Sequence, residues 1–182
     1  MEHNEELSWY ALRVFHNRLR SVKAELEEEG YSTYVAMRTV DSISEGSLQY
    51  AQIPIIPSLM FVRADERRIL ALRQAHFGEL MVYTRSDGKT PAPIDPKQME
   101  VFILVTSAQS GRAVEFFENA EEHYRKGDPV RVTAGIFKGA VGVVKRIKKD
   151  RKLLVAIDGV AIVAVPHIPM EFLEPMPDHS RA

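Results

Sequence analysis

The sequence predicts an α+β protein in which a unit of strands and three helices precedes a small all-β domain. Three observations predict this class. Strand-like apolar runs alternate with helical periodicity from 9 to 107. From 127 to 176, β-branched runs are separated by glycine-containing turns. The chain of 182 residues is long enough for one large domain or two small ones.

A helix is predicted between the first two strands. Residues 9–15 (WYALRVF) are apolar, aromatic and β-branched, which is typical of a strand. Asn17 is a suitable N-cap for a helix over 18–29, where apolar residues recur at helical spacing. Gly30 is placed to end that helix, and 31–40 again have the composition of a strand.

The next segment joins a polar stretch to a strand that contains prolines. Residues 41–52 are rich in serine and predict a loop or a mobile hairpin tip. Residues 53–64 (IPIIPSLMFVRA) predict a third strand. Pro54 and Pro57 cannot donate a ladder hydrogen bond, so we expect them at the start of this strand or at a sheet edge.

Two further helices are each introduced by an aspartate. Asp65 is predicted to cap a helix over 66–74. Asp95, followed by a proline at the first helical position, is predicted to cap a helix over 96–108. A short strand over 80–84 is expected between them.

The C-terminal part predicts a sheet of short strands after a glutamate-rich linker over 110–124. The dipeptide Asp158-Gly159 stands between two apolar runs, which is a strong hairpin signal. Residues 177–182 are expected to form a flexible tail. The predicted strands cover 130–132, 141–147, 153–157, 160–165 and 171–176.

Composition excludes several classes of function. The chain has no cysteine, which excludes disulfides, iron–sulfur clusters, thiolate zinc sites and cysteine nucleophiles. Its six histidines show no metal-binding spacing and no phosphate-binding loop follows a strand, so we expect no metal, no cofactor and no enzyme. With no signal sequence and no long apolar run, the sequence predicts a monomeric cytoplasmic protein without a membrane partner.

A glycine-punctuated stretch over 127–150 resembles the KOW motif of transcription elongation factors and ribosomal proteins. That resemblance implies a small SH3-like barrel over 125–176. Glycine takes positive φ without a steric penalty, so the glycines of the Thr-Ala-Gly-Ile-Phe-Lys-Gly segment are expected at turns. The positions that carry the resemblance are Gly127, Asp128, Val130, Val132, Gly135, Phe137, Gly139 and Gly142.

Three elements ahead of that stretch extend the resemblance to NusG-type transcription factors. They are the Trp9-Tyr10 pair, the strand that begins Ile56-Pro57, and the Pro-Ala-Pro-Ile sequence that ends at Ile94. The layout implies an NGN-like domain over 7–109, an α/β sandwich built on an antiparallel sheet with three helices.

Other residues resemble a specialised branch of this family. Leu59 replaces the tyrosine of the housekeeping strand, and the barrel hairpin that usually carries an apolar-aromatic pair has Asp158-Gly159 instead. These features are most similar to the UpxY-type antiterminators of capsular polysaccharide operons. Asp158 puts the housekeeping contacts with termination factor Rho and a ribosomal protein in doubt.

The family resemblance implies that the N-terminal domain binds the clamp helices of the largest RNA polymerase subunit. The apolar candidates, by position, are Tyr10, Ile56, Leu59 and Phe61. Side chains alternate faces along a strand, so Leu59 and Phe61 share one face. Whether that face binds polymerase or packs in the core stays open at this stage.

A basic cluster lies at the first strand–helix junction, which in the family faces the non-template DNA strand. Its members are Arg13, His16, Arg18, Arg20 and Lys23. Contacts with DNA or nascent leader RNA there would depend on salt. The alternative is a solvated helix face whose cations pair with nearby glutamates.

The barrel segment is also basic. Residues 125–174 contain ten Lys or Arg and five Asp or Glu, a net charge of +5. This pattern favours contact with RNA or the ribosome, or else a polar turn that protects strand edges.

The sequence thus predicts an operon-specific regulator of elongation that suppresses pausing and termination. The alternatives are a general NusG-like elongation factor and a KOW-type RNA- or ribosome-binding protein. For an enzyme we would expect a deep polar pocket that contains a side chain with a strongly shifted pKa.

Overall fold

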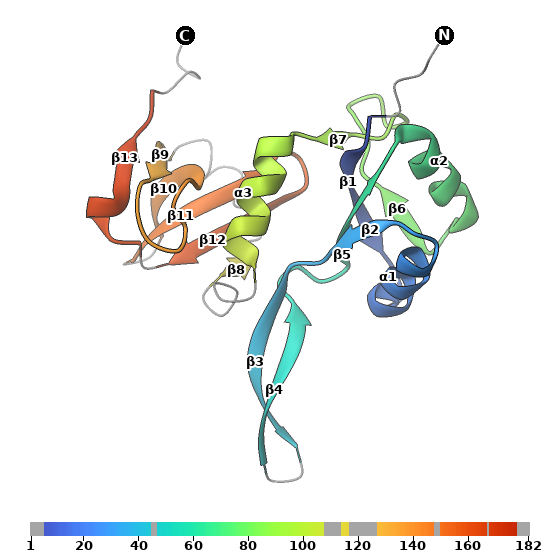
Figure 1. Cartoon of the computed structure of the whole chain (residues 1–182), viewed down its shortest axis with the longest axis horizontal. Coiled ribbons are helices and arrows are strands. Elements are labelled where there is room, and N and C mark those ends of the chain that lie inside the picture. Colours follow the sequence, from blue (N-terminus) through green and yellow to red (C-terminus); the bar gives the residue numbers. More distant parts are fainter. Residues whose placement is uncertain are drawn as a thin grey trace. The chain divides into compact units, whose positions relative to one another are not determined.

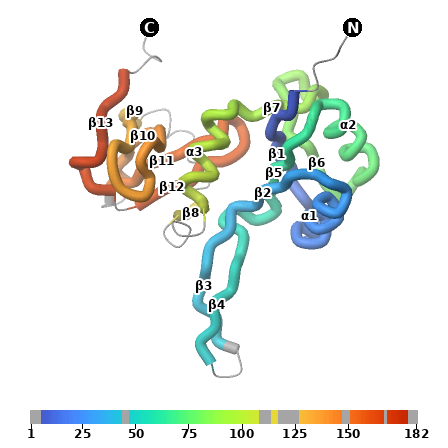
Figure 2. Tube along the Cα trace, viewed as in Figure 1, coloured from blue at the N-terminus to red at the C-terminus, as the bar shows by residue number. Residues whose placement is uncertain are grey.

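The structure is a computed structural model that describes residues 6–44, 47–107, 114–116, 127–147, 150–166 and 168–177. The chain divides into two compact units. The first comprises Met1–Ala36 and Ile56–Met99, and the second comprises Met37–Ile55 and Glu100–Ala182. Figure 2 traces the chain through both units.

The first unit is built on an antiparallel sheet with the strand order β2-β5-β1-β6, and β7 also pairs with β1 (Figure 1). Its centre is the pairing of β1 with β5, in which Ala11 is directly opposite Phe61. The strands are β1 (Ser8–Val14), β2 (Ser32–Tyr34), β5 (Leu59–Ala64), β6 (Leu80–Val82) and β7 (Pro93–Ile94).

Two helices, α1 (Leu19–Glu28) and α2 (Glu66–Ala75), cover one face of this sheet (Figure 1). Alternate residues of each central strand point toward them because side chains change face at every residue of a strand. The buried core on this side combines residues of both helices and three strands, namely Tyr10, Leu12, Val14, Leu19, Val22, Leu26, Met60, Val62, Ala64, Ile69, Leu72, Leu80 and Val82.

The start of α1 differs from the prediction. His16 and Asn17 both adopt positive φ, 56° and 57°, and the helix begins only at Leu19. Arg18 is the N-cap residue and makes no side-chain capping bond. Asn17 therefore lies in the tight turn that leads into the helix. Asparagine is suited to this position because it adopts the left-handed region more readily than most residues.

The other end of α1 follows the prediction. Gly30 has φ of 83°. Its N–H donates to the carbonyl of Glu27 at 3.1 Å, and the N–H of Tyr31 donates to that of Leu26 at 2.9 Å. This pair of bonds is the Schellman arrangement, which satisfies the last carbonyls of the helix.

The predicted strands over 31–40 and 53–64 are each wrong as single elements. The first is divided into β2 and β3 (Met37–Ser44), and the second into β4 (Ser47–Pro54) and β5. A turn with Ser58 at φ 63° separates β4 from β5. Proline lacks the donor that a continuous ladder needs, so Pro54 ends its strand.

β3 and β4 form a two-stranded antiparallel ribbon of their own, from the pair Met37–Pro54 to the pair Ser44–Ser47 (Figure 1). The polar stretch over 41–52 is therefore mostly strand, and the tip at 45–46 lies outside the described residues. One face of the ribbon carries the exposed side chains of Ile43, Leu48 and Tyr50.

The later helices agree with the prediction at their starts. The Asp65 carboxylate accepts a hydrogen bond from the N–H of Arg68 at 2.8 Å, which caps α2. Asp95 accepts from the N–H groups of Lys97 and Gln98 at 2.9 and 3.0 Å before α3 (Pro96–Thr106).

The second unit contains a six-stranded antiparallel sheet with the order β13-β9-β10-β11-β12-β8. The 3-10 turn η1 (Met170–Phe172) precedes its last strand. The strands are β8 (Glu115–Phe116), β9 (Asp128–Val132), β10 (Val141–Ile147), β11 (Asp150–Ile157), β12 (Ala161–Pro166) and β13 (Leu173–Pro175). The α+β class predicted from the sequence is confirmed.

The glycines of the KOW-like stretch occupy positions that a side chain would disturb. A Cβ on Gly142 would lie 2.2 Å from the carbonyl oxygen of Leu154, and a Cβ on Gly127 would lie 2.9 Å from the side chain of Val143. Gly135 and Gly139 have φ of 79° and 93° in the turn between β9 and β10. Gly127 and Gly142 are therefore required because a side chain would not fit. Gly135 and Gly139 are required because their backbone has positive φ.

The hairpin between β11 and β12 forms where the Asp-Gly signal predicts it. Gly159 has φ of 71°, and the N–H of Val160 donates to the carbonyl of Ile157 at 3.0 Å. Some of the predictions lie outside the described residues. They are the domain limits near 109 and 125, and residues 178–182 of the predicted tail. β8 falls within the segment predicted as a linker.

Candidate functional site

The face of the first sheet that points away from α1 and α2, here called the distal face, carries a group of apolar side chains. It contains Ala11, Leu59 and Phe61, with the ring centre of Tyr34 6.4 Å from that of Phe61. Ala11 and Phe61 pair directly across β1 and β5, as do Arg13 and Leu59. Directly opposed residues share a face, so the pairing places these side chains together.

Two of the four residues predicted to bind polymerase lie together on the distal face. Leu59 and Phe61 are adjacent there, and both are buried. Tyr10 pairs with Val62 and points the other way, into the core beneath α1 and α2. Burial, with the nearby Glu66 carboxylate as a smaller cause, raises the pKa of Tyr10.

Ile56 lies in the turn before β5 and is also buried. The sequence does not reveal Ala11 as a neighbour of Phe61, because that contact depends on the register between β1 and β5. The alternation of side-chain faces within 59–62 can be predicted from the sequence. The strand that pairs with this segment cannot.

The basic junction is partly neutralised by ion pairs. Arg18 donates to the carboxylates of Glu79 and Glu25, the latter at 3.2 Å. Lys23 donates to Glu27 at 2.6 Å, one helical turn away. These are the contacts of the alternative interpretation, in which the cations pair with glutamates on a solvated helix face.

Two of these carboxylates, those of Glu27 and Glu79, have a pKa below the ordinary value. The hydrogen bond from Lys23, followed by that from Thr33, lowers the pKa of Glu27. The hydrogen bond with His76, with smaller contributions from Arg18, lowers the pKa of Glu79. Glu27 is exposed and Glu79 is only half-buried, so solvent screens the ion pairs and they contribute little to stability.

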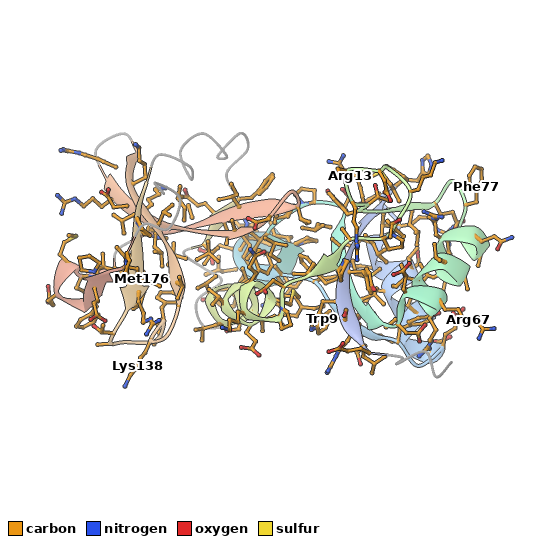
Figure 3. All side chains as sticks on the ribbon, turned by 90° about the horizontal axis from the view of Figure 1, so that it is seen from above. Trp9, Arg13, Arg67, Phe77, Lys138 and Met176 are labelled. Carbon is orange, nitrogen blue, oxygen red and sulfur yellow. The ribbon has the colours of Figure 1, made fainter. Side chains whose placement is uncertain are left out.

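Arg13 and His16 differ from the paired cations. The side chain of Arg13 is exposed (Figure 3), and within the described part of the chain this side chain forms no hydrogen bond or ion pair. His16 is exposed, and its ring meets that of Phe15 edge-on at 6.3 Å. The unpaired charge of the junction therefore lies beside β1 rather than along α1.

Comparison with known proteins gives a family. Residues 7–103, more than half of the chain, match the family model described as "Transcription termination factor nusG". The chain belongs to the NusG family. It is a NusG-like transcription elongation or antitermination factor, and family membership implies that it binds RNA polymerase. NusG-family transcription factors are not enzymes.

A solved structure described as "Domain interaction in Thermotoga maritima NusG" is also similar. It is 20% identical, with a TM-score of 0.45, and the match covers 94% of this chain and 98% of that one. No curated protein matches the chain.

Two further features are absent from the described residues of this NusG-family chain. No helix there is long and apolar enough to cross a membrane. Nor does any group of three or more acidic or histidine side chains in those segments have the geometry to hold a metal ion.

The second sheet contains the basic residues predicted after the KOW-like glycines. Lys152 donates to Glu115 of β8 at 2.5 Å. Arg146 of β10 is directly opposite Arg151 of β11. Lys148 and Lys149 lie outside the described residues.

Proposed function

We propose that this NusG-family protein is an operon-specific antiterminator of the UpxY type. Its N-terminal domain, proposed to span 7–109, binds the clamp helices of the largest polymerase subunit through the distal face. The observation that carries this proposal is the adjacency of Leu59 and Phe61 beside Ala11 on one face of the sheet. An apolar surface edged by Arg13 and Arg63 fits a helix that presents apolar side chains within a polar surround.

Both side chains are buried in the chain alone, so the distal face must become accessible before a polymerase helix reaches it. The free energy for antitermination then comes from tighter binding to the elongating polymerase than to the paused one. No covalent step is involved.

The DNA or leader-RNA contact is proposed for Arg13 and His16, with Arg18, Arg20 and Lys23 as the wider basic junction. Arg13 supports this assignment because its charge is exposed and has no carboxylate partner among the described residues. Phosphate contacts of this kind depend on salt because they release counterions.

The specialised role is supported by the hairpin between β11 and β12. Ile157 is buried, and the two residues exposed at the tip are Asp158 and Gly159. This tip offers no exposed apolar-aromatic pair, so contacts of the housekeeping kind with Rho or a ribosomal protein have no apolar anchor there.

Retention of RNA polymerase by the immobilised full-length chain tests the polymerase contact. Leu59→Glu should abolish retention, and Phe77→Glu, a charge introduced at an exposed position, should leave it unchanged. Circular dichroism must show that both variants fold. Retention of polymerase by a folded Leu59→Glu variant would falsify the assignment of the distal face.

Genome-wide polymerase occupancy, with and without the protein, tests the operon-specific role. We expect a change confined to one operon and extending past its terminators. A uniform change across the genome would identify a general elongation factor instead.

A further inference from the structure

A groove of about 710 Å³ lies in the second unit, where β9 begins and β10 ends. β13 and the turn before it complete the wall. Arg151 lies at the start of β11 and Asp158 follows its last residue, so the groove and the Asp158 hairpin are at opposite ends of that strand. The groove is therefore separate from the hairpin discussed above.

The cationic side of this groove contains an unusual pair. Arg146 and Arg151 are exposed and directly opposite each other across β10 and β11. Like charges in directly opposed positions destabilise a sheet. Within the segments that the structure describes, neither arginine forms an ion pair or hydrogen bond, and Asp128 at the groove rim pairs with neither.

Protection of a strand edge explains a charge at this position, but it does not require two like charges directly opposite each other. Charged side chains often prevent edge strands from pairing with another chain. β10 pairs with β9 only over Val141–Val144, and β11 pairs with β12 only from Lys152 onward, so Arg146 and Arg151 lie where the β10–β11 hairpin extends beyond its neighbouring strands. Lys152, on the next pair along, is already neutralised by Glu115. Among the described residues, the positive charge at Arg146 and Arg151 therefore has no neutralising partner and is available to a ligand of the groove.

Apart from Asp128, Lys145 and the two arginines, the described lining of the groove is apolar. Its wall includes Val130, Leu173, Met170 and Met176. Methionine side chains adapt to irregular partners because they are unbranched and polarisable. None of the described residues that line the groove is aromatic. Grooves that bind single-stranded nucleic acid rely on aromatic rings for stacking with bases, so this lining favours a peptide over RNA.

We infer that this groove binds an acidic protein segment, with an apolar side chain against Val130 and Leu173 and flanking carboxylates on Arg146 and Arg151. Arginine suits carboxylates because its planar guanidinium can donate two parallel hydrogen bonds. Pro175 lacks a backbone donor, which argues against simple strand addition at β13 and for recognition through side chains. The inference does not rest on polymerase binding.

The test uses the full-length chain and a fluorescein-labelled peptide of four Glu-Asp-Leu repeats, followed by fluorescence anisotropy. We expect saturable binding that weakens with salt. The double variant Arg146→Gln/Arg151→Gln should weaken it about tenfold. Asp128→Asn should tighten it because a competing carboxylate is removed from the rim. Leu173→Ser should weaken it, as should replacing leucine by serine in the peptide.

Lys138→Gln is the matched control, since it removes a positive charge from an exposed position outside the groove (Figure 3, in which Lys138 and Met176 are labelled). It should leave the affinity unchanged. The double arginine variant should remain folded, because it removes a repulsion. If the double arginine variant does not fold, the affinities of Asp128→Asn and Leu173→Ser for the peptide test the inference instead.

Three results would overturn the inference: no binding of the acidic peptide, equal losses with Lys138→Gln and with the arginine variant, or tighter binding of oligouridylate that the arginine variant abolishes. The last result would identify an RNA groove. None of these measurements uses polymerase, so the outcome is independent of the proposed function.

Discussion

At the residue scale, Phe61 shows why one strand position is both a core residue and a candidate binding residue. Its side chain is fully buried, although it lies on the distal face. Phe77, by contrast, is 90% exposed and points outward in Figure 3. The two phenylalanines thus provide a matched pair for measuring what burial contributes.

Phe61→Ala should lower the free energy of unfolding by about 3–5 kcal/mol, because it removes apolar contacts and leaves a cavity. Phe77→Ala should change it by less than about 0.5 kcal/mol. Urea unfolding followed by circular dichroism measures both. Equal effects of the two substitutions would contradict the burial of Phe61.

Gly142 and Gly159 separate two reasons for glycine. A Cβ at Gly142 meets the Leu154 carbonyl oxygen at 2.2 Å, whereas nothing lies within 4 Å of one at Gly159. Gly159→Ala should cost only the strain of positive φ, about 1–2 kcal/mol. Gly142→Ala should cost more, because backbone must move. Thermal unfolding of the two variants measures both losses of stability. A larger loss for Gly159→Ala than for Gly142→Ala would contradict the prediction.

At the element scale, the cap of α2 can be tested alone. Asp65 accepts a hydrogen bond from the N–H of Arg68 at the start of the helix. Asp65→Ala should destabilise the protein by about 1 kcal/mol, and Asp65→Asn should retain most of the stability because asparagine also caps helices. Chemical unfolding measures the difference. If Asp65→Ala were as stable as Asp65→Asn, the capping hydrogen bond would contribute nothing measurable to stability.

The turn after β6 depends on the charge of Asp87. Its carboxylate accepts hydrogen bonds from the Thr90 hydroxyl at 2.5 Å and from the N–H groups of Lys89 and Thr90. These bonds, the Thr90 hydroxyl first, lower the pKa of Asp87 to about 2. A depressed pKa means that the folded turn favours the charged form. Its stabilising effect is therefore present above the ordinary value of 3.8 and is lost as the pH falls toward about 2.

Titration of the Asp87 carboxyl by NMR should give a pKa near 2, and Thr90→Val should raise that pKa toward the ordinary value. Thr90→Ser retains a hydroxyl and serves as the control. An unchanged pKa in Thr90→Val would show that the backbone bonds alone hold the charge.

At the scale of the whole molecule, the paired and unpaired cations of the basic junction predict different roles. Arg13 has no carboxylate partner in the described segments, whereas Lys23 is held by Glu27. If Arg13 contacts phosphate, Arg13→Gln should weaken binding to a transcription elongation complex and reduce the salt slope by about 1. Lys23→Gln removes a charge that Glu27 already neutralises, so both effects should be smaller than those of Arg13→Gln. Equal effects would indicate a diffuse electrostatic contribution.

The sequence by itself determined the class of the fold and the local signals within it. Asp65, Asp95, Gly30 and the Asp158-Gly159 pair act where their chemistry predicts, because capping, helix termination and tight turns depend on a few neighbouring residues. The α+β class followed from the change between helical and strand periodicity.

Only the tertiary structure decided the division of 31–40 and 53–64 into separate strands and the partners of each face. Strand pairing joins residues far apart in sequence, so composition could not show that Phe61 lies opposite Ala11 while Tyr10 points into the core beneath α1 and α2. The same holds for Arg146 and Arg151, whose pairing across β10 and β11 depends on register. Local chemistry thus sets the elements, and long-range pairing sets which side chains share a surface.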